Sequence, residues 1–245
     1  MSFIALDTDI LMYKATQAVE EEIEWEPDIW TLYMDLNRAK DHFIAQVDRI
    51  KARLNVDEVV YCVTDYEENF RKQLDKDYKS NRRGTRKPVG YKALLDWVRE
   101  EMKGVIRPRC EADDSLGILA TTPENIGNCI IVSDDKDLKT IPGQLYRPSN
   151  DELMTITQED ADYFFYTQTL TGDATDNIPG LKGVGPKTAE KLLGNRPHWG
   201  AVEQAFIKAG QTKEDAIHQA RLVRILRHED WDYEKGEPKL WMPKT

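Results

Sequence analysis

Short apolar runs that lead directly to acidic residues recur along the chain. Three such runs, residues 3–6, 59–63 and 129–132, lead to Asp7, to Asp65 and to the group Asp134, Asp135 and Asp137. Continuous apolar runs of this length, bounded by polar residues, are typical of strands that are buried on both faces. We therefore predict buried strands that each deliver a carboxylate at the carboxyl end.

A helical period separates the first two runs. Its apolar positions are Leu36, Ala39, Phe43, Val47, Ile50 and Leu54. This spacing places them on one face of an amphipathic helix. An order of strand, helix and strand predicts an α/β fold with a mostly parallel central sheet flanked by helices, in which sites form beyond the carboxyl ends of the strands. The acids at those ends are therefore candidates for one shared site.

The pattern changes along the chain in a way that suggests two parts. Residues 1–157 contain the predicted sheet, with a long insertion at about 66–109 that has helical stretches at both ends. Residues 158–245 contain a helical segment, a glycine-rich turn, a further helix and an irregular tail. We predict a core domain followed by a smaller helical module, with the boundary near residue 157.

Composition indicates a soluble protein of a reducing compartment. Of the 245 residues, 40% are hydrophobic, which is enough for a core. No apolar run approaches the roughly 18 residues of a membrane helix, and Asp7 and Asp9 interrupt the N-terminal segment, which argues against a signal peptide. The three cysteines have no CxxC spacing, so we expect buried free thiols and not a disulfide or zinc site. We expect a cytoplasmic protein with no membrane partner.

Acidic residues gather at the predicted strand ends and helix starts. They are Asp7, Asp65, Glu111, Asp113, Asp114, Asp135, Asp137, Asp173 and Asp176. Any one of them alone is explained as a helix cap or a solvated turn residue. If they converge, however, they raise one another's pKa unless cations compensate, and Mg²⁺ prefers such oxygen ligands. The set exceeds the needs of one octahedral ion, which favours two ions about 3.5–4 Å apart that act in phosphoryl transfer.

The first part of the insertion has the opposite charge. From residue 71 to 92 it carries nine basic residues against only Asp75 and Asp77, although the whole chain has a net charge of −10. The nine are Arg71, Lys72, Lys76, Lys79, Arg82, Arg83, Arg86, Lys87 and Lys92. A solvated helix face would normally mix the two signs. An excess of one sign near Tyr78 and Tyr91 instead indicates contact with phosphates and stacking on nucleotides.

The segment GLKGVGPKT, which we call the glycine turn, has the form of a helix–hairpin–helix connection. Gly183 and Gly185 permit backbone conformations closed to other residues, and Pro186 suits the first turn of a following helix. Free N–H groups in such a turn can bind phosphate without reading sequence, and Lys182 and Lys187 add positive charge. The alternative is a plain loop between two packed helices.

Four segments, taken in order, resemble the 5′-nuclease (flap endonuclease) superfamily, which includes the 5′-nuclease domain of bacterial DNA polymerase I. They are TDYEENFRKQLDKDYKSNR, EADD, SDDKDL and TGDATDNIPGLKGVGPKTA. The segments LDTDILMYKA and KPVGY look closest to the double-strand 5′-exonucleases of short-tailed bacteriophages. The resemblance spans nearly the whole chain. It implies a PIN-like 5′-nuclease core, a helical arch formed by the insertion, and a helix–hairpin–helix (H3TH) module.

The resemblance also implies a role for each acid. A first metal ion would be held by Asp65, Glu111, Asp113 and Asp135, and a second by Asp137, Asp173 and Asp176, with Asp7 close behind and Asp114 in support. The start Asp7-Thr8-Asp9 departs from the Asp-Gly-Asn common in the family. A third acid, Asp134, stands directly before Asp135, which leaves the register of this motif open.

The remaining roles concern the substrate. Lys79, helped by Arg82, would stabilise the scissile phosphate and act with Asp135 in catalysis, and Tyr78 would offer a stacking surface. Contacts with DNA are implied for Arg71, Lys72, Tyr78, Arg83, Arg86, Lys87, Lys182, Gly183, Gly185, Lys187 and Thr188. The resemblance further implies a K⁺ ion at the glycine turn.

The residue patterns together with the family resemblance imply a Mg²⁺-dependent 5′→3′ exodeoxyribonuclease and flap endonuclease that hydrolyses double-stranded DNA by a two-metal mechanism, with Mn²⁺ able to replace Mg²⁺. We expect a monomer that acts in the bacterial host cytoplasm during phage DNA replication, on flapped DNA and on RNA primers in RNA–DNA hybrids. Two alternatives are open: a non-catalytic protein that binds DNA structures, and a PIN-like ribonuclease. The carboxylate set opposes the first, because a binding protein gains nothing from negative charge beside DNA. The glycine turn and the basic insertion oppose the second.

Overall fold

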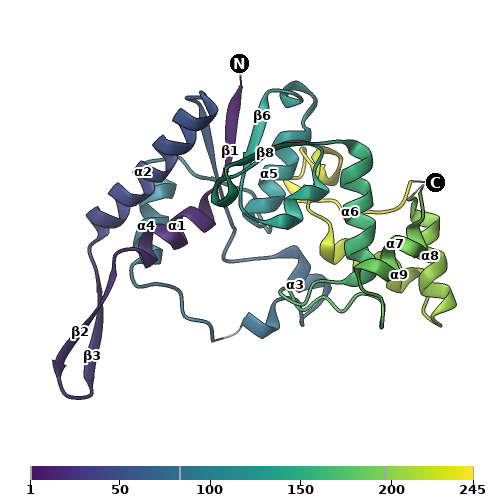
Figure 1. Cartoon of the computed structure of the whole chain (residues 1–245), viewed down its shortest axis with the longest axis horizontal. Helices are drawn as coiled ribbons and strands as arrows, with labels where there is room; N and C mark the ends of the chain where they lie inside the picture. The colour runs from purple at the N-terminus through teal and green to yellow at the C-terminus, as the bar shows by residue number, and fades with distance from the viewer. Residues whose placement is uncertain (1, 83, 196, 245) are drawn as a thin grey trace.

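Helices cover both faces of a central sheet, and a helical lobe follows on one side (Figure 1). The computed structural model describes residues 2–82, 84–195 and 197–244. The α-helices are α1 (Thr8–Gln17), α2 (Leu36–Leu54), α3 (Phe70–Leu74), α4 (Tyr91–Glu100), α5 (Ala112–Thr121), α6 (Gln158–Thr171), α7 (Pro186–Leu193), α8 (Trp199–Lys208) and α9 (Lys213–Val223). Short 3₁₀ helices are η1 (Ser80–Arg82), η2 (Pro123–Asn125), η3 (Lys136–Thr140), η4 (Pro148–Asn150) and η5 (His228–Asp230).

The central sheet has the strand order β5-β4-β1-β6-β7-β8, and it is parallel except for the β7–β8 pair. Its strands are β1 (Phe3–Asp7), β4 (Val59–Val63), β5 (Val105–Ile106), β6 (Cys129–Val132), β7 (Gly143–Arg147) and β8 (Glu152–Ile156). The mostly parallel α/β architecture predicted from the sequence is confirmed. Because β4, β1 and β6 run side by side in the same direction, the acids that follow them reach one edge of the sheet.

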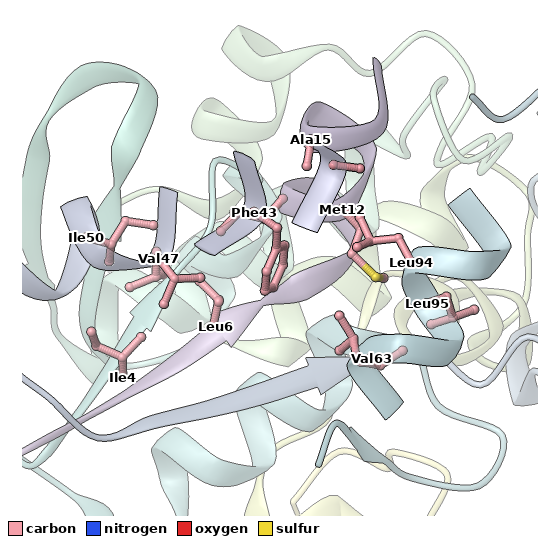
Figure 2. Packing of buried hydrophobic residues seen from close by; sticks show 14 of the residues in the cluster. Ile4, Leu6, Met12, Ala15, Phe43, Val47, Ile50, Val63, Leu94 and Leu95 are labelled. Atoms are coloured by element: carbon pink, nitrogen blue, oxygen red, sulfur yellow. The ribbon is translucent and has the colours of Figure 1, made fainter. Parts of the chain in front are cut away.

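Strand β1 lies at the centre, with all five residues buried. Its side chains alternate between two apolar layers. One layer joins Leu6 to Met12 of α1, Phe43 of α2 and Leu94 of α4 (Figure 2). The other joins Phe3 and Ala5 to α5. Burial on both faces explains why the run is apolar at every position. The predicted amphipathic helix is α2, whose inward face is buried in the first layer.

The helical lobe of α6 to α9 has its own apolar cluster, which includes Leu170 and Phe206. Helix α6 starts where the boundary was predicted, with the Thr157 hydroxyl accepting a hydrogen bond from the Asp160 amide. After α9, however, the chain returns to the core, where Leu226 packs beside α5. A Cβ on Gly117 of α5 would lie 2.3 Å from the Leu226 carbonyl oxygen, so only glycine permits this approach. The tail thus ties the lobe to the core, and the two-part division stays a prediction.

A β-hairpin formed by β2 (Glu20–Glu26) and β3 (Ile29–Met34) extends from the core between α1 and α2 (Figure 1). It was not predicted, because five glutamates make β2 a poor strand by propensity. Pairing with the aromatic-rich β3 and a turn with Asp28 at φ 66° compensate for this. A smaller antiparallel pair, β9 (Trp231–Asp232) and β10 (Glu237–Pro238), lies in the tail.

The insertion begins with α3 and η1 and has α4 as its last helix, which confirms the two helical stretches. Strand β5 of the central sheet follows α4, however, and lies inside the predicted range of about 66–109, where no strand was predicted. Nonhelical backbone at residues 84–90, which we call the strap, joins the two (Figure 1). The three cysteines are buried and free, as predicted. Across the described ranges, no helix has the length and apolar character to cross a membrane.

Candidate active site

A cleft of about 690 Å³ lies at the carboxyl edge of β4, β1 and β6. Predicted acids that line it are Asp7, Asp65, Glu111, Asp113, Asp135, Asp137, Asp173 and Asp176. Segments separated by more than 150 residues in sequence thus converge here. Among the described residues of the lining, eleven carboxylates stand against six cationic side chains. The cleft therefore has an excess of negative charge that the protein does not neutralise.

Strand ends and helix starts place the acids of the core, as the sequence predicted, whereas Asp173 and Asp176 lie in a loop and not at such a position. Asp7 ends β1 and caps α1, and its other carboxylate oxygen accepts a 2.6 Å hydrogen bond from the Ser133 hydroxyl. Asp135 caps η3 by accepting a hydrogen bond from the Asp137 amide at 2.8 Å. Glu111 is the N-cap of α5. Each acid is thereby fixed by the backbone of an element that packs against the sheet.

The last two acids come from a tight loop after α6. The Asp173 amide donates to the Ile178 carbonyl and the Ile178 amide donates back, at 2.9 and 2.8 Å. The loop closes where Gly172 and Gly180, both at positive φ, lie back to back, and a Cβ on either would come within 2.3 Å of backbone atoms. These glycines are therefore required to bring Asp173 and Asp176 to the cleft.

Burial and mutual repulsion disfavour ionisation in the middle of the cleft. Burial raises the pKa of Asp113 well above its usual range, and Asp7 and Asp135 raise it further. Burial and the neighbouring Asp9 raise the pKa of Asp7 to about 7. Burial and Asp135 raise the pKa of Asp137 to about 7. Such carboxylates would gain most from a bound cation.

Lysine and arginine side chains at the rim of the cleft form ion pairs with some of its acids. Lys79 Nζ lies 2.6 Å from Glu111 Oε1 and 3.6 Å from Asp176 Oδ2. Although burial opposes ionisation, Lys79 and then Arg71 hold the pKa of Glu111 at about 2. Arg82 pairs with Asp176, and Lys136 Nζ lies 3.2 Å from Asp173. The basic insertion thus meets the acids directly.

The donor set fits hard divalent cations by its chemistry, because it consists of carboxylates with an uncompensated charge. Within the described part of the chain, no group of three acidic, histidine or cysteine side chains is already arranged to hold a metal ion. Three of the acids, Glu111, Asp173 and Asp176, instead pair with cations of the chain itself. An ion would have to displace these contacts.

Asp114 and Arg71 require a correction. The resemblance implied a metal-supporting acid and a DNA contact, but the two form a buried bidentate ion pair, with side chains 0% and 3% exposed. Arg71 also donates to the carbonyl oxygens of Leu222 and Arg224, and Asp114 accepts from the Leu226 amide. Asp114 is not part of the cleft lining. The pair instead joins the insertion to α5 and to the returning tail.

Replacing Arg71 by methionine should therefore destabilise the protein strongly. The change leaves the Asp114 carboxylate buried without its partner, which costs about 3–5 kcal/mol of unfolding free energy. Urea unfolding measures this, and the double variant Arg71→Met/Asp114→Leu should recover part of the loss because no lone charge remains. An Arg71→Met protein that unfolds like the wild type but binds DNA weakly would restore Arg71 as a DNA contact.

Tyr78 and Arg86 also differ from expectation. Tyr78 is 4% exposed, and its hydroxyl donates to Glu111 at 2.8 Å, so it supports the acids and cannot act as a stacking surface. Arg86 forms an ion pair with Glu20 of β2, which leaves its guanidinium engaged. Lys72 and Lys87 are exposed and line the cleft. Arg83 lies outside the described residues.

The glycine turn lies beyond the acid loop and precedes α7. The predicted contact residues Lys182, Gly183, Gly185, Lys187 and Thr188 are all exposed there. Gly183 has φ +80° and open space around it, whereas Gly185, with φ −100°, caps α7 ahead of the proline at its first position. The geometry leaves this turn accessible to a ligand, as a phosphate contact requires.

Several cleft residues were not predicted. Asp9 lines the cleft two residues after Asp7, a spacing that was noted but not assigned a role. Gln168 donates to Asp137 at 2.6 Å from the last turn of α6, where no local pattern marks it. The register of the third acidic motif is also resolved in the structure, because Asp134 pairs with Lys14 and is not in the cleft lining, whereas Asp135 is.

Comparison with known proteins gives a consistent picture. The model of the 5′-3′ exonuclease N-terminal, resolvase-like domain matches residues 2–163. The exonuclease of Escherichia phage T7 is 33% identical, covering 98% of this chain and 93% of its own. The exodeoxyribonuclease of Enterobacteria phage T3 is 31% identical, covering 99% and 93%. The phage T5 flap endonuclease, crystallised as a pseudo-enzyme-product complex with DNA and metal ions, has the same fold with a TM-score of 0.64 over 91% of this chain and 89% of its own, at 14% identity.

Proposed function

This chain belongs to the 5′-3′ exonuclease family, and we propose that it hydrolyses phosphodiesters at the 5′ ends of double-stranded and flapped DNA with two bound Mg²⁺ ions. That it is a nuclease follows from its relatives. The convergence of eight predicted acids beside Lys79 in one cleft is the observation that carries the finer proposal. Bound Mg²⁺ would neutralise these acids and polarise both the attacked phosphate and a water molecule.

In this proposal the acids of the cleft hold the metal ions and the cations bind the scissile phosphate. Asp65, Glu111, Asp113 and Asp135 would hold one ion and Asp137, Asp173 and Asp176 the other, with Asp7 behind them. Lys79 and Arg82, released from their acids, would donate to the oxygens of the scissile phosphate, where negative charge develops. Mn²⁺ is expected to replace Mg²⁺, because it prefers similar ligands.

The substrate would contact the protein on both sides of the cleft. At the glycine turn, exposed backbone together with Lys182 and Lys187 suits the duplex backbone, and this turn would also hold K⁺. Lys72 and Lys87 suit the 5′ strand at the cleft. The phage T5 flap endonuclease of the same fold was crystallised with DNA and metal ions, which supports a DNA substrate. RNA primers in hybrids, a monomeric state and action in the host cytoplasm belong to the same proposal.

The two alternatives lose support. A protein that only binds DNA would not gain from carboxylates whose pKa is raised by their own crowding. A PIN-like ribonuclease would not need the glycine turn, and the phage T3 relative, which spans nearly the whole chain, is an exodeoxyribonuclease by name.

One assay with three substrates tests the proposal. An end-labelled blunt duplex, a 5′-flapped duplex and an RNA–DNA hybrid are each incubated with Mg²⁺, with Mn²⁺ and with EDTA. We expect release of short products from the 5′ end in either metal and none in EDTA. Cleavage that continues in EDTA would exclude the metal mechanism, and products from the 3′ end would exclude the polarity.

A further inference from the structure

The base of the β-hairpin holds the strap through one carboxylate. Glu20 Oε1 and Oε2 each accept a 2.7 Å hydrogen bond from Arg86, and Oε2 also accepts one from the Val89 amide at 2.6 Å. The Glu20 side chain is 13% exposed, so this contact is well packed for a surface ion pair. Glu20 therefore engages a side chain and a backbone group of the strap at the same time.

The residue opposite Glu20 in the ladder makes a second contact. Met34 pairs with Glu20 across the two strands, so both side chains lie on the same face of the β-hairpin. A Cβ on Gly90, at the end of the strap, would lie 1.6 Å from Met34 Cε, which means that the methionine fills this space. One cross-strand pair thus fixes the strap by charge at Arg86 and by packing at Gly90.

The opposite side of the strap faces the cleft. Lys87 Nζ stands 3.8 Å from the ring centre of Tyr66 and 4.1 Å from that of Tyr91. The two hydroxyls are 2.7 Å apart, and all three residues line the cleft. Adjacent residues of the strap therefore point to different partners: Arg86 to the β-hairpin and Lys87 to the cleft. Holding Arg86 also fixes the direction of Lys87.

We propose that Glu20 is a positioning residue for cleavage, which with Met34 holds the strap so that Lys87 faces the 5′ strand in the cleft. The inference rests on the proposed function. It reverses the simple electrostatic expectation, in which removing an acid near DNA and freeing Arg86 would strengthen binding and speed cleavage. The positioning role predicts slower cleavage when Glu20 is neutralised, whereas the simple electrostatic expectation predicts faster cleavage.

Glu20→Gln tests whether cleavage becomes slower or faster. Glu24→Gln is the matched control, because Glu24 is an exposed acid on the same face of β2. Under single-turnover conditions with a 5′-flapped duplex and Mg²⁺, Glu20→Gln should cleave about tenfold more slowly, since misplaced substrate contacts reduce the rate. Duplex affinity in Ca²⁺ should be unchanged or tighter. Glu24→Gln should cleave like the wild type. A Glu20→Gln enzyme that cleaves at the wild-type rate or faster overturns the proposal.

Exchanging the charges of Glu20 and Arg86 distinguishes a loss of their ion pair from a general structural effect of the substitutions. Glu20→Arg and Arg86→Glu should each slow cleavage, and the double variant should recover part of the rate, because the ion pair re-forms in reverse while the Val89 amide still lacks its acceptor. No recovery would overturn the assigned pairing. Hydrogen exchange at residues 86–90 is a readout that needs no activity: it should rise in Glu20→Ala and not in Glu24→Ala. If the wild-type chain cleaves none of the three substrates, the proposed function fails, while this exchange measurement still decides whether Glu20 holds the strap.

Discussion

Asp135→Asn should lower the rate of 5′-flap cleavage in Mg²⁺ by about 10³-fold or more, because the variant loses a proposed metal ligand in the cleft. The asparagine oxygen can still accept the hydrogen bond from the Asp137 amide, so the start of η3 should stay intact. Removing one charge also lessens the repulsion that Asp113 and Asp137 experience from Asp135. The loss should therefore be of catalysis and not of folding, and DNA binding in Ca²⁺ should persist.

The chain provides a close control for this variant. Asp134→Asn makes the same chemical change one residue earlier, but Asp134 pairs with Lys14 and Ser149 and is not in the cleft lining. It should retain cleavage within about twofold, as expected for a partly exposed ion pair. Gel-based single-turnover assays and DNA binding by fluorescence anisotropy check both variants. Normal cleavage by Asp135→Asn, or an equal loss in Asp134→Asn, would show that the acids are assigned incorrectly.

Those acids of the cleft that follow strands were predictable because their positions follow from the sheet topology. Asp7 and Asp135 each follow an apolar run, and parallel strands of one sheet deliver such residues to a common edge. An apolar run followed by an acid can be recognised within a few adjacent residues. The amphipathic helix α2 was predictable for the same reason, since its buried face repeats within one segment.

Partner choice between distant charges was not predictable. Arg71 and Asp114 both belong to motifs that suggest a site, yet they satisfy each other in the interior. Nothing local distinguishes Arg71 from Lys72, which remains exposed. The β-hairpin was missed because its stability comes from cross-strand pairs, and a run of glutamates gives no period. Patterns along the sequence do not show which residues pair when the partners lie far apart in the chain.

Lysine and arginine side chains pair with acids of the cleft in the structure. Lys79, Arg82 and Lys136 occupy the acids in the structure, and the same cations suit phosphate when metal ions take the acids. Under the proposed function, the cleft would exchange one set of ion pairs for another when substrate and metal bind. Such an exchange would explain how an acidic protein accepts a polyanion at its most acidic point.

Lys79→Ala tests that exchange, and we expect cleavage to slow by about 10²–10³-fold, because the phosphate loses a charged donor in a partly buried site. Lys79 is held in place by its backbone, with φ 54° and its amide donating to the Asp176 carbonyl at 2.8 Å, so the side chain is directed into the cleft. Duplex affinity in Ca²⁺ should fall by less than about threefold, since many other phosphate contacts remain. Lys79→Arg should recover part of the rate.

Lys72→Ala is the matched control for Lys79→Ala. Lys72 also belongs to the basic insertion and lines the cleft, but it is exposed and forms no ion pair with the acids among the described residues. Its loss should weaken binding and lower the salt dependence slightly, with the single-turnover rate at saturating enzyme nearly unchanged. The ratio of the two effects separates a catalytic cation from a binding one. If Lys79→Ala lowers rate and affinity by equal factors, Lys79 only positions the DNA, and the charge that stabilises the transition state must come from elsewhere in the cleft.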